Sequence, residues 1–79
     1  MARIVLHMTF PTMNEVAAHL DAVRQGQGLS AEHIADLTGI SPRQVIAKLN
    51  GERPITTGDL SKFATALGTT PGQVYTALA

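Results

Sequence analysis

The sequence predicts an all-α domain, a bundle of five short helices preceded by a short β-strand. Two observations predict the helices: five segments begin at a Ser or Thr that can cap a helix, and apolar residues recur every three or four positions behind each cap. A third observation sets the first residues apart, because apolar residues alternate there. Seventy-nine residues suffice for one domain. We expect a dimerisation arm over residues 1–11 and the helical domain over residues 12–79.

The first helix begins at a capping box. Thr12 can accept a hydrogen bond from the amide three residues on, and Glu15 can reach back to the amide of Thr12. Gly26 and Gly28 are expected to end the helix, which we place at about residues 13–25. Its apolar face is formed by Met13, Val16, Ala17, Leu20 and Val23.

The second helix is predicted over residues 31–38, with Ser30 as its cap. Gly39 follows and is expected in the left-handed conformation that ends many helices. Ser41 and Pro42 then begin a third helix, because Ser caps well and Pro fits the first helical position. Two helices joined by so short a turn can cross at a wide angle.

The last two helices follow a loop in which Pro54 disfavours helical geometry. Thr56 or Thr57 caps the fourth helix, with Asp59 near its positive end. Gly68 ends that helix and Thr70 begins the fifth.

The amino-terminal segment alternates with a period of two, and its apolar positions are Ile4, Leu6, Met8 and Phe10. A lone strand leaves its backbone amides unsatisfied, and no second strand pattern exists in the chain. We therefore predict that the strand pairs with its copy in a homodimer. The alternatives are an extended arm over the helices and a disordered tail.

Composition excludes several classes of function. Six basic and six acidic residues give no net charge, which argues against a non-specific nucleic-acid coat. Cysteine is absent, and the three histidines lack metal-ligand spacing. We find no membrane span, catalytic triad or phosphate loop. We expect a non-enzymatic protein without cofactor, metal or membrane contact, in the cytoplasm of a bacterium or phage-infected host.

The third helix carries the residues that can read DNA. At about 100° per residue, Val45, Leu49 and Pro42 fall on the inward side, while Arg43, Gln44 and Ala47 point outward. In a major groove, Arg suits guanine, Gln suits adenine, and Ala can touch a thymine methyl group. Ser41 would lie at the helix start, close to the groove floor or a phosphate. The predicted phosphate contacts are Arg24, Ser30, Lys48, Asn50 and Arg53.

Residues 14–78 resemble the lambda-repressor-like helix-turn-helix domain of phage Cro and CI proteins and of bacterial XRE-type regulators. The resemblance is carried by GLSAEHIADLTGIS, LNGERPIT and ALGTTPGQV, and the last two are also similar to HigA-type antitoxins. It implies a bundle of four to five helices in which the second and third form the reader. By this resemblance Pro42, Arg43 and Ala47 face bases, and Ser30, Asn50 and Arg53 lie near the backbone.

One departure from the family concerns Arg24. Many members pair the matching basic residue with an acid at the position where this chain has Leu49. We therefore expect Arg24 to be free for a phosphate. Together these features predict a homodimeric regulator of the phage Cro or repressor type that binds double-stranded DNA at a pseudo-palindromic operator. The alternative is an antitoxin-like or other protein-interaction module with a toxin partner, which the neutral net charge favours.

Overall fold

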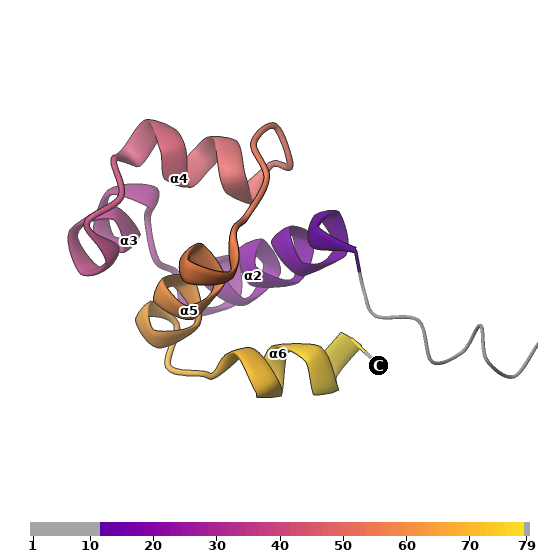
Figure 1. Cartoon of the computed structure of the whole chain (residues 1–79). Helices are drawn as coiled ribbons and strands as arrows, with labels where there is room; N and C mark the ends of the chain where they lie inside the picture. Colours follow the sequence, from indigo (N-terminus) through magenta and orange to yellow (C-terminus); the bar gives the residue numbers. More distant parts are fainter. Residues whose placement is uncertain (1–11, 79) are drawn as a thin grey trace, which may run out of the picture.

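Five helices follow one another along residues 12–78, the part of the chain that the computed structural model describes. They are α2 (Met13–Gln27), α3 (Ala31–Thr38), α4 (Pro42–Leu49), α5 (Thr57–Ala66) and α6 (Pro71–Leu78) (Figure 1). The prediction of an all-α domain is confirmed for these residues, which contain no strand. The predicted strand and its four dimerisation residues (Ile4, Leu6, Met8 and Phe10) lie outside the described residues.

Side-chain caps begin the helices where the sequence predicts them. The Thr12 hydroxyl accepts from the Glu15 amide at 3.1 Å, and the Glu15 carboxylate accepts from the Thr12 amide at 3.2 Å, so the capping box is confirmed. Thr56, and not Thr57, caps α5, and Asp59 completes a second box there. The amides of the first helical turn have no carbonyl partner within the helix, and the cap accepts a hydrogen bond from one of them. Each helix therefore starts at its cap.

The end of α2 differs from the prediction. The helix continues through Gly26 to Gln27 and ends at Gly28, whose φ is 71°. A glycine inside a helix costs about 1 kcal/mol relative to alanine but does not stop the helix. Termination requires the left-handed conformation that Gly28 adopts here, and Gly28 donates to the carbonyls of Arg24 and Gln25.

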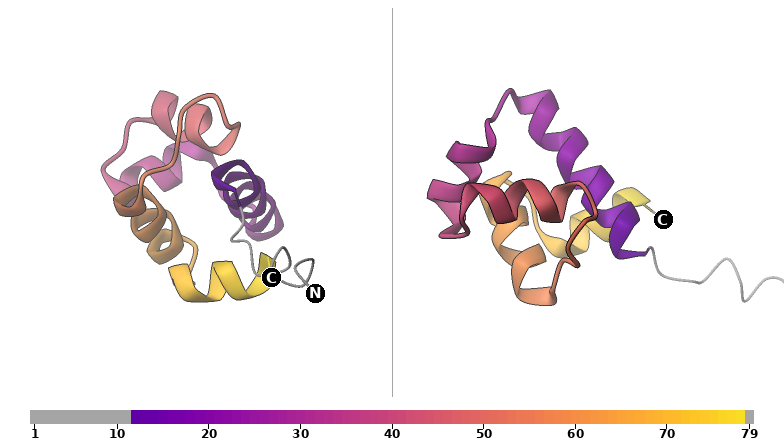
Figure 2. Two further views of the ribbon diagram at one scale, coloured as in Figure 1. Left: turned by 45° about the vertical axis from the view of Figure 1, so that its right-hand side comes forward. Right: turned by 90° about the horizontal axis from the view of Figure 1, so that it is seen from above.

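The core lies where the five helices meet, and every helix contributes to it. α2 packs against α4 and α6, and α3 packs against α4 and α5, an arrangement that Figure 2 shows from two further sides. The largest fully buried side chains are Phe63, Leu20, Ile34, Leu60, Val16, Val45 and Val74. Within residues 12–78, none of the helices combines the length and apolar character that crossing a membrane needs.

Candidate nucleic-acid interface

The turn between α3 and α4 fixes the angle at which these helices cross. Gly39 has a φ of 77°, the left-handed conformation that the sequence predicts, and its amide donates to the Ala35 carbonyl at 2.8 Å. The Thr38 hydroxyl donates to the Ile34 carbonyl at 2.8 Å and accepts from the Ile40 amide at 3.2 Å. These bonds join the last turn of α3 to the residues that follow it on either side of Gly39. The turn therefore sets the orientation of α4 relative to α3.

α4 lies along one edge of the molecule, with one face against the core and the other outward (Figures 1 and 2). Val45 is 0% exposed and Leu49 is 6% exposed, whereas the Arg43 side chain is open to solvent. Gln44 and Ala47 are partly exposed beside it. The predicted rotation of α4, with Val45 inward and Arg43 outward, is therefore confirmed.

The start of α4 presents the remaining predicted base contacts. Ser41 caps the helix, since its hydroxyl accepts from the Gln44 amide at 3.3 Å, and Pro42 occupies the first turn. Both residues are exposed, so the inward position that the helical wheel gave Pro42 is wrong: the core covers Val45 and Leu49 and does not reach the first residue of the helix. All five side chains are thus at least partly exposed on α4 and its cap, and their contact with bases stays a prediction.

Three of the predicted phosphate contacts flank this surface. Ser30 caps α3, and its hydroxyl accepts from the His33 amide at 3.1 Å. Asn50 ends α4, and Arg53 lies in the loop that follows. All three are exposed. An exposed helix start and an exposed cation near α4 are groups that bind backbone phosphates.

The expectation that Arg24 is free is wrong. Its Nη2 forms an ion pair with Asp21 at 2.9 Å, and its Nε donates to the same carboxylate at 3.0 Å. Its Nη1 also donates to the Leu29 carbonyl at 2.8 Å. Leu49 provides no carboxylate for Arg24, as the sequence shows. Asp21, which lies one turn before Arg24 on α2, provides the carboxylate instead. A phosphate contact by Arg24 would require these bonds to open.

Lys48 is not free for a phosphate either. Its ammonium group pairs with Asp59 of α5, and the two side chains are only 16% and 14% exposed. The sequence indicated Asp59 only as a residue at the start of α5. Its ion pair with Lys48 was not predicted. No local spacing could reveal the pair, because it joins two helices across the intervening loop.

The Asp59 carboxylate is held in its charged form. Burial alone would raise its pKa, but hydrogen bonds from Lys48 and Thr56 and the charge of Lys48 outweigh burial and lower the pKa below its ordinary value of 3.8. One carboxylate therefore both caps α5 and fixes the last turn of α4 to that cap.

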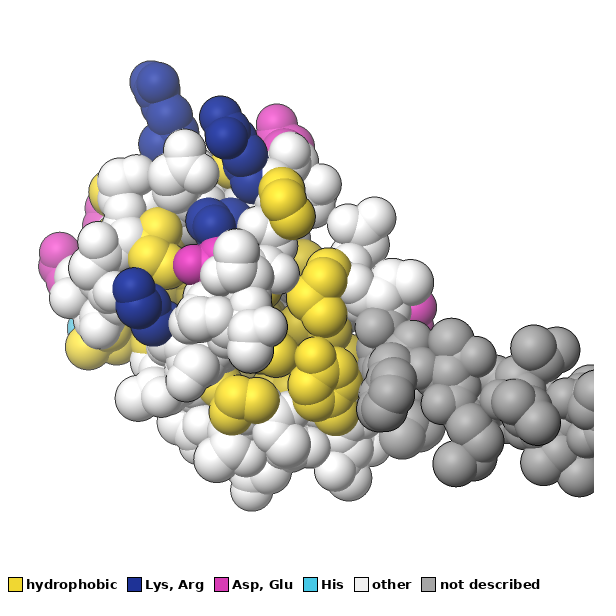
Figure 3. Space-filling view, in the orientation of Figure 1, with side chains coloured by type: hydrophobic (Ala, Val, Ile, Leu, Met, Phe, Trp, Pro, Cys, Tyr) yellow, Lys and Arg dark blue, Asp and Glu magenta, His cyan; other side chains and the backbone are white. Residues whose placement is uncertain are grey.

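The two ion pairs decide which cations remain on the surface. Among residues 12–78 they engage Arg24 and Lys48, and leave Arg43, Arg53 and Lys62 exposed outside any ion pair. Figure 3 shows Lys and Arg side chains projecting from the edge of the molecule that α4 forms. Positive charge is therefore available at α4 although the chain as a whole is neutral.

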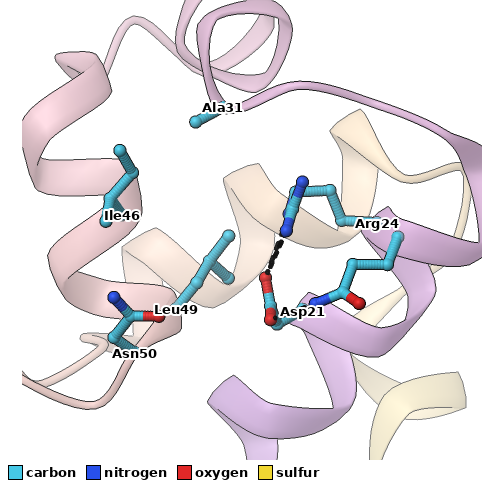
Figure 4. A pocket seen from close by; sticks show the side chains of 7 residues that line it. Asp21, Arg24, Ala31, Ile46, Leu49 and Asn50 are labelled. Atoms are coloured by element: carbon cyan, nitrogen blue, oxygen red, sulfur yellow. Dashed lines mark hydrogen bonds and ion pairs between the residues drawn. The ribbon is translucent and has the colours of Figure 1, made fainter.

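An open cleft of about 360 Å³ separates α2 from α4 beside this surface. The Asp21–Arg24 ion pair lies on its α2 side (Figure 4). Ile46 projects into it from α4, toward Ala31 at the start of α3. Ile46 was not among the residues predicted from the sequence, although its place on the helical wheel, next to Arg43, could have shown it. The lining residues are Asp21, Arg24, Gln25, Ala31, Ile46, Leu49 and Asn50.

Comparison with known proteins gives two matches. The family model described as helix-turn-helix matches residues 20–74, which include all of α3, α4 and α5. The chain is also similar to the restriction-modification controller protein C.AhdI from Aeromonas hydrophila, with 28% identity and a TM-score of 0.73. That match covers 80% of this chain and 96% of the controller. No curated protein matches the chain.

Proposed function

The chain belongs to the XRE-type helix-turn-helix family of DNA-binding transcription regulators, and on this premise we propose that it reads one operator sequence by inserting α4 into the major groove. The observation that carries the proposal is the position of Arg43, exposed on the outward face of a helix whose inward face is buried through Val45 and Leu49. Membership of this family and the likeness to a controller protein point to a regulator and not to an enzyme.

Base reading would fall to the surface of α4. The Arg43 guanidinium can donate two parallel hydrogen bonds to O6 and N7 of a guanine, worth about 1–3 kcal/mol of discrimination. Gln44 can pair with an adenine, and Ala47 can touch a thymine methyl group. Ser41 and Pro42 would face the groove where α4 begins. This division of roles is supported by the full or partial exposure of all five side chains.

Phosphate contacts would hold α4 in register. Ser30 with the free amides at the start of α3 would bind one backbone, and Asn50 and Arg53 would bind near the other end of α4. Arg24 and Lys48 are left out of this set because both are engaged in ion pairs inside the domain.

We further propose that two copies act together, through the segment at residues 1–11. Its alternating Ile4, Leu6, Met8 and Phe10 support a strand paired across a two-fold axis. A dimer would place two copies of α4 in major grooves about one helical turn apart. Deletion of residues 1–10 should convert a dimer to a monomer in light scattering, and an unchanged molar mass would remove the role of the segment.

The likeness to a controller protein favours one biological setting. C.AhdI is a restriction-modification controller, and the resemblance over four-fifths of this chain supports a controlling role for this chain as well, which we place in the cytoplasm. A phage repressor of the Cro type would use the same surface. DNase footprints on the sequence around its own gene, followed by transcription of that template in vitro, would show which promoters the protein controls.

The neutral net charge favours a second candidate, an antitoxin-like module that binds a toxin and for which DNA binding is secondary. The direct test of the first candidate is selection of bound duplexes from random DNA. Enrichment of two related half-sites would support an operator-reading dimer. Failure to enrich any sequence at low salt would leave the protein-interaction module as the better explanation.

A further inference from the structure

Ile46 is an apolar side chain on the outward part of the reading helix. It is 48% exposed, while Val45 and Leu49, the other large apolar residues of α4, are buried. Successive residues of a helix are rotated by about 100°, which places Ile46 between the buried Leu49 and the exposed Arg43. Ile also lowers helix propensity relative to Ala or Lys, so helix stability does not explain its presence at an exposed position.

The cleft between α2 and α4 covers part of the Ile46 side chain. The side chain lines this cleft, facing Ala31, with Leu49 on the same wall (Figure 4). About half of the side chain is thus covered and half remains open to a ligand of α4. A β-branched residue has few rotamers on a helix, which further limits its movement.

Ile46 lies at the edge of the outward face of α4, next to Arg43 on the helical wheel. It shares the cleft with Asn50, which is a predicted phosphate contact. In the major groove the C5-methyl group of thymine is the feature of the base closest to its own backbone, outside O4. It is also the apolar group by which thymine differs from the other bases.

We propose that Ile46 determines specificity by contacting the C5-methyl group of a thymine beside the base pair that Arg43 reads. This inference rests on the proposed function, since it assumes that α4 enters the groove. It assigns to this chain a preference for thymine at one position per half-site.

Deoxyuridine provides the test, because it differs from thymidine only by the missing methyl group. Each thymine of the selected operator is replaced in turn by deoxyuridine, and dissociation constants are measured for the full-length protein. At one position per half-site, apart from any thymine that Ala47 touches, the wild-type protein should lose about fourfold in affinity, the effect expected for one buried methyl group. For Ile46→Ala the thymine and uracil operators should bind equally at that position.

Two further variants keep the result interpretable. Leu37→Ala removes a similarly exposed residue (55%) from α3 and should retain the wild-type response to uracil. Ile46→Gln provides a second variant with good helix propensity should Ile46→Ala fold poorly, and circular dichroism confirms the folding of each.

The outcomes separate this inference from the proposed function. Two results would show that Ile46 does not read thymine although α4 still reads DNA. In the first, the wild-type protein selects an operator but no uracil substitution weakens binding. In the second, both Ile46 variants keep the wild-type response to uracil. In the second case Ala47 becomes the reader of the methyl group. If no operator is selected, the proposed function itself fails.

Discussion

The ammonium group of Lys48, on the last turn of α4, pairs with the carboxylate of Asp59, which is also the acid of the capping box that begins α5. One carboxylate thereby connects the end of the reading helix to the start of the next helix. The loop between them carries the exposed Arg53. Lys48 thus contributes to the position of α4 while its charge is neutralised by Asp59.

Substitution of Asp59 should destabilise the domain in a pH-dependent way. Asp59→Asn removes the charged partner of Lys48 and should lower the free energy of unfolding at pH 7 by about 1–3 kcal/mol. The pKa of Asp59 is lowered by folding, so the stabilisation is complete above the ordinary value of 3.8 and is lost as the pH falls through the folded pKa.

Urea unfolding over a pH series from neutral to strongly acidic measures this effect. The difference between wild type and Asp59→Asn should be largest at neutral pH and should shrink in acid. Asp36→Asn, at an exposed position on α3, is the matched control and should change stability little. A difference that did not depend on pH would show that the charge of Asp59 contributes nothing.

Lys48 and Arg53 should differ in the salt dependence of DNA binding. Each phosphate that a cation neutralises adds about −0.9 to the slope of log affinity against log salt concentration. Arg53→Ala should therefore make the slope shallower by about 1 per protomer. Lys48→Ala should leave the slope unchanged, because Asp59 already neutralises this side chain. Equal changes of slope in both variants would mean that Lys48 leaves its ion pair to bind DNA.

Arg43 should carry specificity more than general affinity. Arg43→Ala is expected to weaken binding to the selected operator by about 1–3 kcal/mol and to relax the preference at one base pair. Competition binding against scrambled duplex measures both effects. Lys62→Ala is the control, since Lys62 is an exposed cation on α5 and not on the reading helix. An equal loss on operator and scrambled DNA would assign Arg43 to the backbone instead of a base.

Two glycines should respond in opposite ways to alanine. Gly39, with a φ of 77°, would force a Cβ into the left-handed region at a cost of about 1–2 kcal/mol. Gly26 lies inside α2, where an added Cβ would meet no neighbouring atom within 4 Å, so alanine should stabilise the helix by about 0.5–1 kcal/mol. Melting temperatures should shift down for Gly39→Ala and up for Gly26→Ala, by roughly 4–8 °C per kcal/mol. Shifts of the same sign would contradict the backbone argument.

The helix starts could be predicted because capping depends on residues three positions apart. Thr12, Ser30, Ser41 and Thr56 each accept a hydrogen bond from an amide within their own first turn. The inward and outward faces of α4 could also be predicted, since the helical period fixes them once Val45 is taken as buried. The end of α2 could not be fixed in the same way, because either of two nearby glycines can end a helix and only the backbone conformation decides between them.

The sequence alone determined the five helices, the turn at Gly39 and the outward direction of Arg43, because hydrogen bonds and periodicity act within one or two helical turns. Only the tertiary structure decided that Lys48 is not available, because it paired this residue with Asp59 of another helix. The Arg24–Asp21 pair, in contrast, joins residues three positions apart on α2, a spacing at which helical side chains are neighbours, so the sequence could have shown it. A pair such as Lys48–Asp59 depends on how closely the packed helices bring two side chains together in space, which the spacing along the chain does not show.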